Sequence, residues 1–344
     1  MKNRKIITIV TMILLTMIIL TGCELDSVSG NDPENSLLIH FIDVGQGDST
    51  LIMFPNNEVA LIDAGTRTGR KELVAYLKDQ DIKKIDYLIG THPHEDHIGG
   101  LPEIIRNFEI GKTYLPNKIN NTAIFEELLN EIKDNNLKII EGKAGVNIID
   151  SQDLQFYILA PSSEYTDINN NSIVTRVVYK DFAVIMTGDA EKESEINMIK
   201  EGHKLKANIL KVGHHGSTTS STDDFLDKVD PDYSVISLGK DNTYGHPHKE
   251  TITALENRGA TILRTDLLGS IVFQTDGKKI NLINKVDIDK SNKNDENIYI
   301  GNINSKIFHV DNCNSLPNKE NQIIFKEKED AFNEGYKPHS VCIK

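Results

Sequence analysis

The sequence predicts an α/β fold, in which a system of strands is interleaved with helices and followed by a small separate C-terminal unit. Short apolar runs of strand length alternate with segments whose apolar residues recur at helical spacing. Polar motifs also follow directly after five of the predicted strands, and these motifs begin at Asp63, His92, Asp189, His214 and His246. Active residues gather along strand ends in such sheets, so the functional site is expected there.

The length and composition limit the classes of protein to consider. The 344 residues, 38% hydrophobic and 26% charged, allow one large domain plus a small one. The formal net charge of -13 argues against non-specific binding of nucleic acid through a basic surface. A bound metal pair would reverse the sign of the charge locally, so a phosphate substrate stays compatible with this composition.

Residues 1–23 are a targeting segment and not part of the fold. Three basic residues among the first five precede an apolar run, Ile6 to Leu20, which is typical of a secretory signal. The run ends in Leu-Thr-Gly-Cys23, which resembles a bacterial lipobox and implies cleavage before Cys23 and lipid attachment to its sulfur. The alternative is an uncleaved membrane anchor. Either way the body is expected outside the cytoplasm, joined to the membrane by a polar tether at 24–36.

The first half of the body is expected to open with strands and to continue with helices and strands in turn. Strands are predicted at 38–44, 49–54, 59–62 and 85–90, with turns at 45–48 and 56–57 and a helix at 71–77. Further on, the pattern predicts helices at 101–108 and 124–132, a short strand at 112–115 and several strands within 137–160.

The second half repeats this alternation. A loop at 169–172 precedes strands at 173–179 and 182–186, and helix signals follow at 191–200. Strands at 208–212 and 233–238, a helix at 250–257 and closing strands through 283 complete the large domain, whose bounds we place at 37–285.

A histidine-rich loop follows the strand predicted at 85–90. Three histidines and one aspartate fall within the six positions from His92 to His97. His92 and His94 alternate and can point the same way, whereas Asp96 and His97 turn the corner and can serve a second point. Imidazoles with a carboxylate suit a borderline metal, so this density predicts a dinuclear metal site. The alternative, an exposed loop that is merely rich in histidine, does not explain the aspartate between them.

Asp189 and the following histidines extend the predicted site. Asp189 would suit a helix N-cap, but beside the other motifs we interpret it as a metal ligand. One of the paired histidines can bind metal while the other orients or donates a proton; we assign His214 to the metal and His215 to catalysis. Asp96 and His246 are the other candidate catalytic residues, and the role of His248 stays open.

Several segments together resemble the metallo-β-lactamase superfamily and, more narrowly, the hydrolase domain of ComEC-type competence proteins. The segments are 41–48, 61–65, 91–100, 186–189, 210–217 and 244–248. The resemblance implies an αββα sandwich with a metal site at its rim. It also implies that His92 and His94 bind a first metal, that Asp96 and His97 bind a second, and that Asp189 bridges the two.

One departure from the superfamily pattern concerns the first metal. Many members supply a further histidine just before the strand pair that ends in the bridging aspartate, whereas this chain carries Asn171 and Ser172 there, as ComEC-like proteins do. The first metal is therefore short of a strong ligand, and it would bind weakly, take more water, or be manganese instead of zinc. We expect Asn171, Ser172 and Ser217 to contact the substrate.

Such a site hydrolyses bonds, because two divalent ions, zinc or manganese, can activate a hydroxide and clamp the attacking and leaving oxygens. The resemblance to competence proteins favours a phosphodiester substrate, that is, nucleic acid outside the cell. Two alternatives stay open: a non-catalytic surface lipoprotein that binds DNA, and a hydrolase of a small ester or lactam. Nothing in the sequence indicates a protein partner.

The C-terminal segment 298–344 follows a charged linker at 286–297. It resembles the small Ada-type metal-binding domains, although His339 stands where that family commonly has the first cysteine of Pro-Cys-x-x-Cys. The resemblance implies a Cys₂His₂ zinc site made of His309, Cys313, His339 and Cys342, and the role of this domain, structural only or docking nucleic acid, stays open. So short a segment has little core of its own, and a metal would supply stability. The alternative is a Cys313–Cys342 disulfide, which an oxidising compartment would permit.

Overall fold

The computed structural model describes residues 36–283, 299–310, 313, 315–325, 328–339 and 342. The predicted lipobox with Cys23, the linker at 286–297 and all of the tether except Ser36 lie outside these residues. Within the described residues, no helix has both the length and the apolar character that a membrane span requires.

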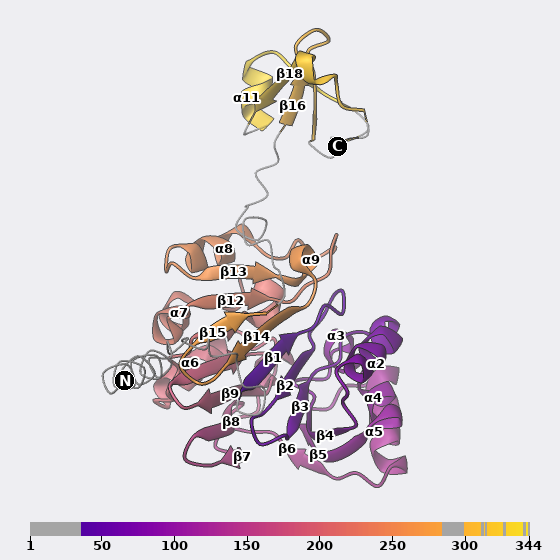
Figure 1. The fold of residues 1–344 in the computed structure, drawn as a ribbon, viewed down its shortest axis with the longest axis vertical. Helices are drawn as coiled ribbons and strands as arrows, with labels where there is room; N and C mark the ends of the chain where they lie inside the picture. Colours follow the sequence, from indigo (N-terminus) through magenta and orange to yellow (C-terminus); the bar gives the residue numbers. More distant parts are fainter. Residues whose placement is uncertain are drawn as a thin grey trace, which may run out of the picture.

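An eight-stranded sheet is built from the strands of the first part of the chain, drawn in indigo and purple in Figure 1, and from two later strands drawn in orange. Its order is β15-β14-β1-β2-β3-β4-β5-β6. The strands are β1 (Leu37–Phe41), β2 (Thr50–Met53), β3 (Val59–Ile62), β4 (Lys84–Ile89), β5 (Glu109–Leu115), β6 (Ile139–Glu141), β14 (Ile271–Thr275) and β15 (Ile280–Leu282). Strands β3 to β6 pair in parallel, and the others pair antiparallel.

A seven-stranded sheet contains most of the second half, in the order β13-β12-β11-β10-β9-β8-β7. The strands are β7 (Asn147–Asp150), β8 (Leu154–Ala160), β9 (Val174–Tyr179), β10 (Phe182–Met186), β11 (Ile209–Lys211), β12 (Tyr233–Ile236) and β13 (Thr261–Arg264). Strands β10 to β13 are parallel. The carboxyl ends of β3, β4, β10 and β11, which are all members of parallel pairs, carry the polar motifs.

Three apolar cores show that the two sheets are packed face to face between helices. One core joins residues of both sheets, a second joins the first sheet to α2, α4 and α5, and a third joins the second sheet to α6, α7 and α8. The helices are α2 (Arg70–Asp79), α3 (Glu95–Ile98), α4 (Leu101–Asn107), α5 (Ala123–Asp134), α6 (Lys192–Lys200), α7 (Asp223–Val229), α8 (Lys249–Glu256) and α9 (Thr265–Leu268). The predicted αββα sandwich is therefore confirmed (Figure 1).

Strand β10 shows why the sequence folds in this way. All five of its residues are apolar and buried. Val184 faces the core between the sheets, and Ile185 faces the core under the helices. A strand buried on both faces reads as a continuous apolar run, because successive side chains point to opposite sides.

Two local differences from the prediction lie at the site. The first strand ends at Phe41 and not at Val44, because residues 42–48 leave the sheet and turn toward the histidine-rich loop. Within that loop, residues Glu95–Ile98 form the short helix α3, an element absent from the prediction, and the corner predicted at Asp96 and His97 lies on this helix. This turn separates them from His92 and His94.

The C-terminal unit is a four-stranded sheet in the order β18-β16-β17-β19, with one short helix. Its elements are β16 (Tyr299–Asn302), β17 (Ile307–Val310), β18 (Gln322–Phe325), α11 (Lys328–Asn333) and β19 (Lys337–Pro338). The buried core of its described residues consists of Phe308, Phe325, Ala331 and Tyr336. This core is small beside the three of the sandwich.

Candidate metal centre

The loops that carry the site pack closely on one another. Gly47 has a φ of +124°, and a Cβ at this position would lie 2.1 Å from the carbonyl oxygen of Asp96. Asp48 donates its backbone N–H to the same oxygen at 3.1 Å. Only glycine permits this approach, so the turn at 45–48 fixes the start of α3.

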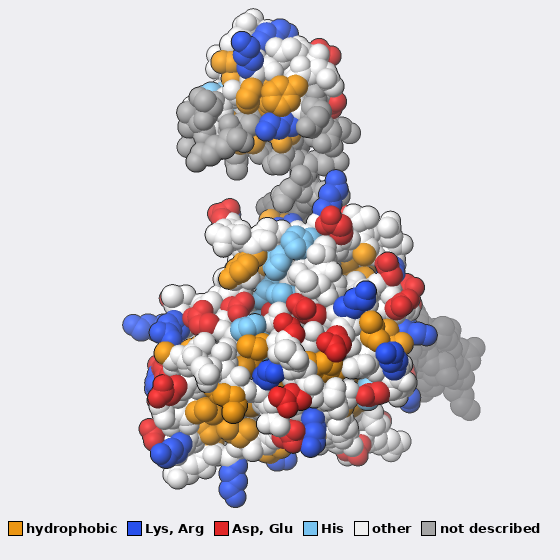
Figure 2. Space-filling model, turned by 180° about the vertical axis from the view of Figure 1, so that it is seen from behind, with side chains coloured by type: hydrophobic (Ala, Val, Ile, Leu, Met, Phe, Trp, Pro, Cys, Tyr) orange, Lys and Arg blue, Asp and Glu red, His pale blue; other side chains and the backbone are white. Residues whose placement is uncertain are grey.

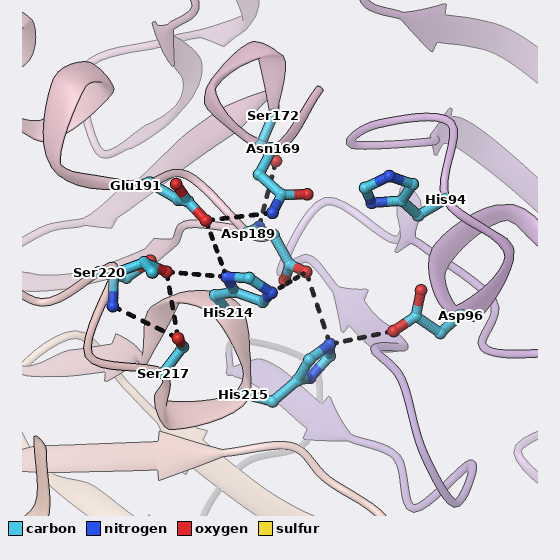
Figure 3. Close-up of polar contacts among 12 residues, drawn as sticks. His94, Asp96, Asn169, Ser172, Asp189, Glu191, His214, His215, Ser217 and Ser220 are labelled. Carbon is cyan, nitrogen blue, oxygen red and sulfur yellow. Dashed lines mark hydrogen bonds and ion pairs between the residues drawn. The ribbon is translucent and has the colours of Figure 1, made fainter. Parts of the chain in front are cut away.

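Four side chains form a compact donor cluster: Asp96, His97, Asp189 and His215, with one ligand atom from each within 4.8 Å of all the others. Nε2 of His97 lies 3.2 Å from Oδ2 of Asp189, and Nε2 of His215 lies 3.3 Å from Oδ2 of Asp96 and 3.6 Å from Oδ2 of Asp189. Figure 3 shows His215 pointing between the two carboxylates.

This cluster fits a divalent metal. Nε2 of His97, Nε2 of His215 and Oδ1 of Asp189 are buried and make no hydrogen bond within the described part of the chain. A buried polar atom without a partner costs roughly 1–3 kcal/mol, so three around one point are expensive unless a cation binds there. Imidazole nitrogens with carboxylate oxygens are a donor set that zinc and manganese accept.

A second pair of donors, His92 and His94, lies next to the cluster and also approaches Asp189. Nε2 of His92 is 2.9 Å from Nδ1 of His94 and 3.8 Å from Oδ2 of Asp189. Asp189 is therefore shared between the two groups of donors, and a bridging ligand requires this arrangement. The His92 side has only two imidazoles and the shared carboxylate, so its donor set is the poorer of the two.

Neighbouring groups fix which nitrogen of each buried histidine faces the site. Oδ2 of Asp63 accepts a hydrogen bond from Nδ1 of His97 at 2.8 Å, and a backbone carbonyl, that of Ser237, accepts from Nδ1 of His215 at 2.8 Å. The Thr91 hydroxyl donates to Asp63 at 2.7 Å, which leaves its lone pairs for Nδ1 of His92 at 3.1 Å. In each ring it is therefore Nε2 that faces the site, where it can offer a lone pair to a metal once it is deprotonated.

A buried ion pair, Asp48 with Lys211, supports His215 from behind. Oδ1 of Asp48 lies 3.3 Å from Nδ1 of His215, and Oδ2 contacts the Lys211 ammonium. Burial alone would raise the pKa of Asp48, but Lys211 and His215 together hold it below its ordinary value. Our reading of the sequence gave neither residue a role. A lysine that ends the apolar strand β11 could have indicated a buried charge at this position, but not which residue pairs with it.

The electrostatics of the cluster favour positive charge. Burial lowers the pKa of His92 well below its ordinary value and also lowers that of His94. Burial acts in the same direction on His97 and His215, yet nearby carboxylates, Asp189 foremost, outweigh it: the pKa of His97 is raised well above its ordinary value and that of His215 to about 10. Where carboxylates hold protons this firmly, a divalent cation can take the place of the protons.

His214 and His215 differ in their surroundings. His215 is buried inside the donor cluster, whereas the side chain of His214 is 23% exposed and its Nε2 is 3.8 Å from Oδ2 of Asp189. Nδ1 of His214 lies 3.1 Å from Oε1 of Glu191 (Figure 3). The same nitrogen lies 3.0 Å from the Thr219 hydroxyl. Both histidines have left-handed backbone, with φ of 49° and 53°, and such strain clusters at functional sites.

The expected substrate contacts are turned inward. The amide of Asn171 bonds the backbone of Tyr165 and Asp167, and Ser172 bonds the backbone N–H of Asp189 at 3.1 Å and Nδ1 of His92 at 3.2 Å. Ser217 is buried and bonds Thr219. Asn171 braces its own loop, and Ser172 positions His92 and Asp189.

An open pocket of about 690 Å³ gives access to the donor cluster. The residues that line it include His94, Asp96, His214, His215 and His246. Figure 2 shows histidine side chains gathered in a stripe on this face, with acidic side chains beside them. Burial lowers the pKa of His246 to about 4, and repulsion from the positive charge of His215 acts in the same direction, so this ring is neutral at pH 7.

The C-terminal unit contains a separate cluster made of His309, Cys313, His339 and Cys342. Nδ1 of His309 lies 3.4 Å from Sγ of Cys313, and Nδ1 of His339 lies 3.2 Å from Sγ of Cys342. Both of these cysteines are free thiols in the described structure. Two thiols and two imidazoles around one point form the donor set of a tetrahedral zinc site.

The sandwich, the shared aspartate and the two groups of donors define a metal-dependent hydrolase. A sequence profile of the metallo-beta-lactamase superfamily matches residues 42–240, and the chain belongs to this superfamily. It is also related to competence proteins, as the resemblance predicted.

Three curated relatives are competence or recombination proteins. ComE operon protein 3 of Bacillus subtilis (strain 168) is 32% identical over 69% of this chain and 33% of its own length. Competence protein ComA of Neisseria gonorrhoeae is 32% identical over 70% of this chain and 33% of its own length. Recombination protein 2 of Haemophilus influenzae is 30% identical over 67% of this chain and 28% of its own length. The chain thus spans about a third of the length of the relatives it matches.

Proposed function

We propose that this protein is an extracytoplasmic, lipid-anchored phosphodiesterase whose substrate is nucleic acid. The observation that carries the proposal is the single buried aspartate, Asp189, shared by two groups of metal donors at the base of an open pocket. Two metals that share a ligand suit in-line displacement at phosphorus. The relation to competence proteins supports nucleic acid as the substrate, and the lipobox supports the location.

The geometry favours an exchange of the roles first assigned to the paired histidines. We assign Asp96, His97, Asp189 and the buried His215 to one metal. His92, His94 and Asp189 would hold the other, and their poorer donor set would suit manganese or weakly bound zinc. Bound there, two divalent ions would supply Lewis acidity and a water of lowered pKa, so that hydrolysis proceeds near neutral pH.

The chain's own side chains then have distinct tasks. Asp96, which is partly exposed to the pocket, orients the attacking water. His214 faces the pocket with Nε2, while Glu191 accepts from its Nδ1 and fixes the ring, so the imidazolium form of His214 is placed to give the Nε2 proton to the leaving oxygen. Asp48 and Lys211 keep His215 in place, and the neutral His246 lines the phosphate site.

In the C-terminal unit we propose one structural zinc ion held by His309, Cys313, His339 and Cys342. The two cysteines lie in a ring of alternating nitrogen and sulfur contacts, which favours a metal over a disulfide. The bounds of this domain at 298–344 and of the hydrolase domain at 37–285 are part of the same proposal.

Strand cleavage tests the function. The full chain would be incubated with single- and double-stranded DNA and Mn²⁺ or Zn²⁺, beside an Asp96→Ala variant. Shortened strands that disappear with Asp96→Ala would support the nuclease and locate its chemistry. DNA that is retained but not cut would favour the non-catalytic binding lipoprotein. In that case the poorer donor set at His92 would explain the lack of cleavage. Neither retention nor cleavage would favour a small ester or lactam.

Membrane fractionation tests the location. The full chain should sediment with membranes, and a Cys23→Ala variant should lose lipid attachment. The proposal of a lipoprotein fails if labelled fatty acid is absent from both proteins.

A further inference from the structure

One rim of the pocket is a loop, Gly239 to His246, that is closed on itself. The Asn242 amide donates to the carbonyl oxygen of Gly239 at 3.3 Å and to that of His246 at 2.7 Å. The N–H of His246 donates back to Oδ1 of Asn242 at 3.0 Å. Gly239 is in turn held by Gln46, whose Oε1 accepts its N–H at 3.2 Å. These bonds hold both ends of the loop, so its middle projects in a fixed direction.

Tyr244 lies in the projecting part. It lines the pocket, and at 64% it has the highest exposed fraction of any phenylalanine or tyrosine among the described residues. Its ring stacks on that of His246, with centroids 5.8 Å apart and planes at 23°. The His246 ring is in turn 6.4 Å from that of His215, at 29°. A series of nearly parallel rings thus leads from the buried donor cluster to the rim.

The fold gains little from a tyrosine so exposed, whereas a flat ring suits a flat ligand. A nucleobase stacks on an aromatic side chain whatever its identity, because every base has a π-face. The loop is already ordered, so little conformational entropy is lost when a base binds.

The charge around the pocket also favours stacking over a basic groove. Lys240 is the one lysine or arginine among the described residues that line it, whereas Glu95, Asp96, Asp189 and Asp241 are acidic. Bound metals offset part of this negative charge at the cluster, but the rim stays acidic. A polyanion held here therefore needs a contact that does not depend on positive charge.

We propose that Tyr244 is a nucleobase platform that makes the site selective for single-stranded nucleic acid, with Lys240 contacting a phosphate beside the stacked base. The inference rests on the proposed function and names the substrate class of the same site. In a duplex the faces of the bases are covered by their neighbours, and exposing one costs a few kcal/mol. A single strand offers its bases directly, so it gains the stack and a duplex does not.

Oligonucleotide binding tests this separately from cleavage. Fluorescence anisotropy with the metal-loaded full chain would compare a labelled single-stranded oligonucleotide whose phosphorothioate backbone resists cleavage, the same backbone without bases, and a blunt duplex. Tyr244→Ala should weaken binding of the base-containing single strand about tenfold and leave the abasic strand unaffected. Tyr244→Phe should bind like the wild type. Ile119→Ala, which truncates another side chain that is 77% exposed, is the matched control.

The salt dependence gives a second measurement. Binding should weaken only shallowly with salt, and Lys240→Ala should reduce the slope of log K against log salt by about one. A steep slope unchanged by Lys240→Ala, or Tyr244→Ala that binds both strands like the wild type, would overturn the inference.

Parallel cleavage assays keep the two proposals distinct. Suppose that the wild type cuts DNA and that Tyr244→Ala cuts base-containing single strands with the same KM as the wild type. This outcome would support the nuclease and overturn the platform. Wild type that cuts nothing but loses single-strand binding with Tyr244→Ala supports the platform and overturns the nuclease. Wild type that neither cuts nor binds overturns both.

Discussion

At the scale of single residues, the adjacent histidines 214 and 215 show how backbone conformation assigns different roles to identical side chains. Left-handed φ values at both positions turn the two rings apart. One ring enters the buried donor cluster, and the other stays at the wall of the pocket beside Glu191. Adjacent identical letters cannot reveal this difference, because it depends on a strained turn between β11 and the following loop.

Alanine substitutions separate the two roles. His215→Ala should lose about one metal ion per chain, because it removes a buried donor from the better site. His214→Ala should keep its metal content and cut DNA roughly 10²- to 10⁴-fold more slowly, the usual contribution of a proton donor. Elemental analysis and single-turnover rates would measure both. Equal loss of metal from the two variants, with unchanged melting, would contradict the exchanged roles.

The protonated histidines predict a pH dependence of metal binding. With its pKa at about 10, the His215 ring is protonated on both nitrogens near pH 7 in the metal-free protein, and the raised pKa of His97 favours the same charged form there. A metal must displace these protons, so its affinity should rise with pH by about tenfold per unit for each proton released. Calorimetric titration between pH 6 and 8 in two buffers of different ionisation enthalpy would count the protons.

The same shifts set the sign for stability without metal. The folded-state pKa of His215 lies above its ordinary 6.5, so its contribution is fully present below pH 6.5 and is lost as pH rises toward 10. The chelated protein should therefore melt at lower temperature as the pH is raised through this range. In the calorimetric titration, a metal affinity that does not change between pH 6 and 8 would contradict the assignment of His97 and His215 as metal ligands.

At the scale of elements, the site depends on how closely two loops approach. The turn at 45–48 meets the start of α3 at Gly47 and not at Gly45, where a Cβ would find no atom within 4 Å. The two glycines have positive φ, so both substitutions strain the backbone, but only one of them also displaces Asp96.

This pair offers a matched comparison. Gly45→Ala should cost about 1 kcal/mol of unfolding free energy, the usual cost of a left-handed alanine. Gly47→Ala should cost clearly more and should also lower metal occupancy, because its Cβ would push on the backbone that carries Asp96. Thermal melts and metal content would be measured on both variants. Similar effects of the two substitutions would show that the loop contact does not control the site.

The elements that the sequence predicts well are those with a local pattern. The five consecutive apolar residues of strand β10 are enough to predict a buried strand. The histidine-rich loop is recognised from the number of histidines within a few positions. The pairing of Asp48 with Lys211 carries no local pattern, because the two residues are far apart in sequence and meet only when the sheets pack. The position of Ser172 is hard to predict for a related reason. The residues around it suggest a polar surface loop, whereas the 3-10 turn η3 (Asn169–Asn171) brings Ser172 into hydrogen-bond contact with His92.

At the scale of the whole molecule, the two clusters of metal donors are embedded in very different amounts of apolar core. The sandwich has three extended cores around its site. The apolar core of the described C-terminal unit consists of four buried side chains, Phe308, Phe325, Ala331 and Tyr336, beside a sheet of short strands. A core of this size supplies little stability. We therefore expect the free energy of metal binding to contribute most of the folding free energy of this unit.

Chelation should therefore affect the two parts unequally. When a strong chelator removes metal, residues 299–342 should lose protection from hydrogen exchange, whereas residues 36–283 should keep most of theirs because their cores do not depend on metal. Cys313→Ser should reproduce the C-terminal loss without a chelator, since it removes one of the four donors. The exposed Ser305, changed to Ala, is a control in the same unit that should leave protection intact. Protection of 299–342 that survives chelation but is lost on adding a reductant would instead establish a Cys313–Cys342 disulfide, because only a disulfide would respond in that order.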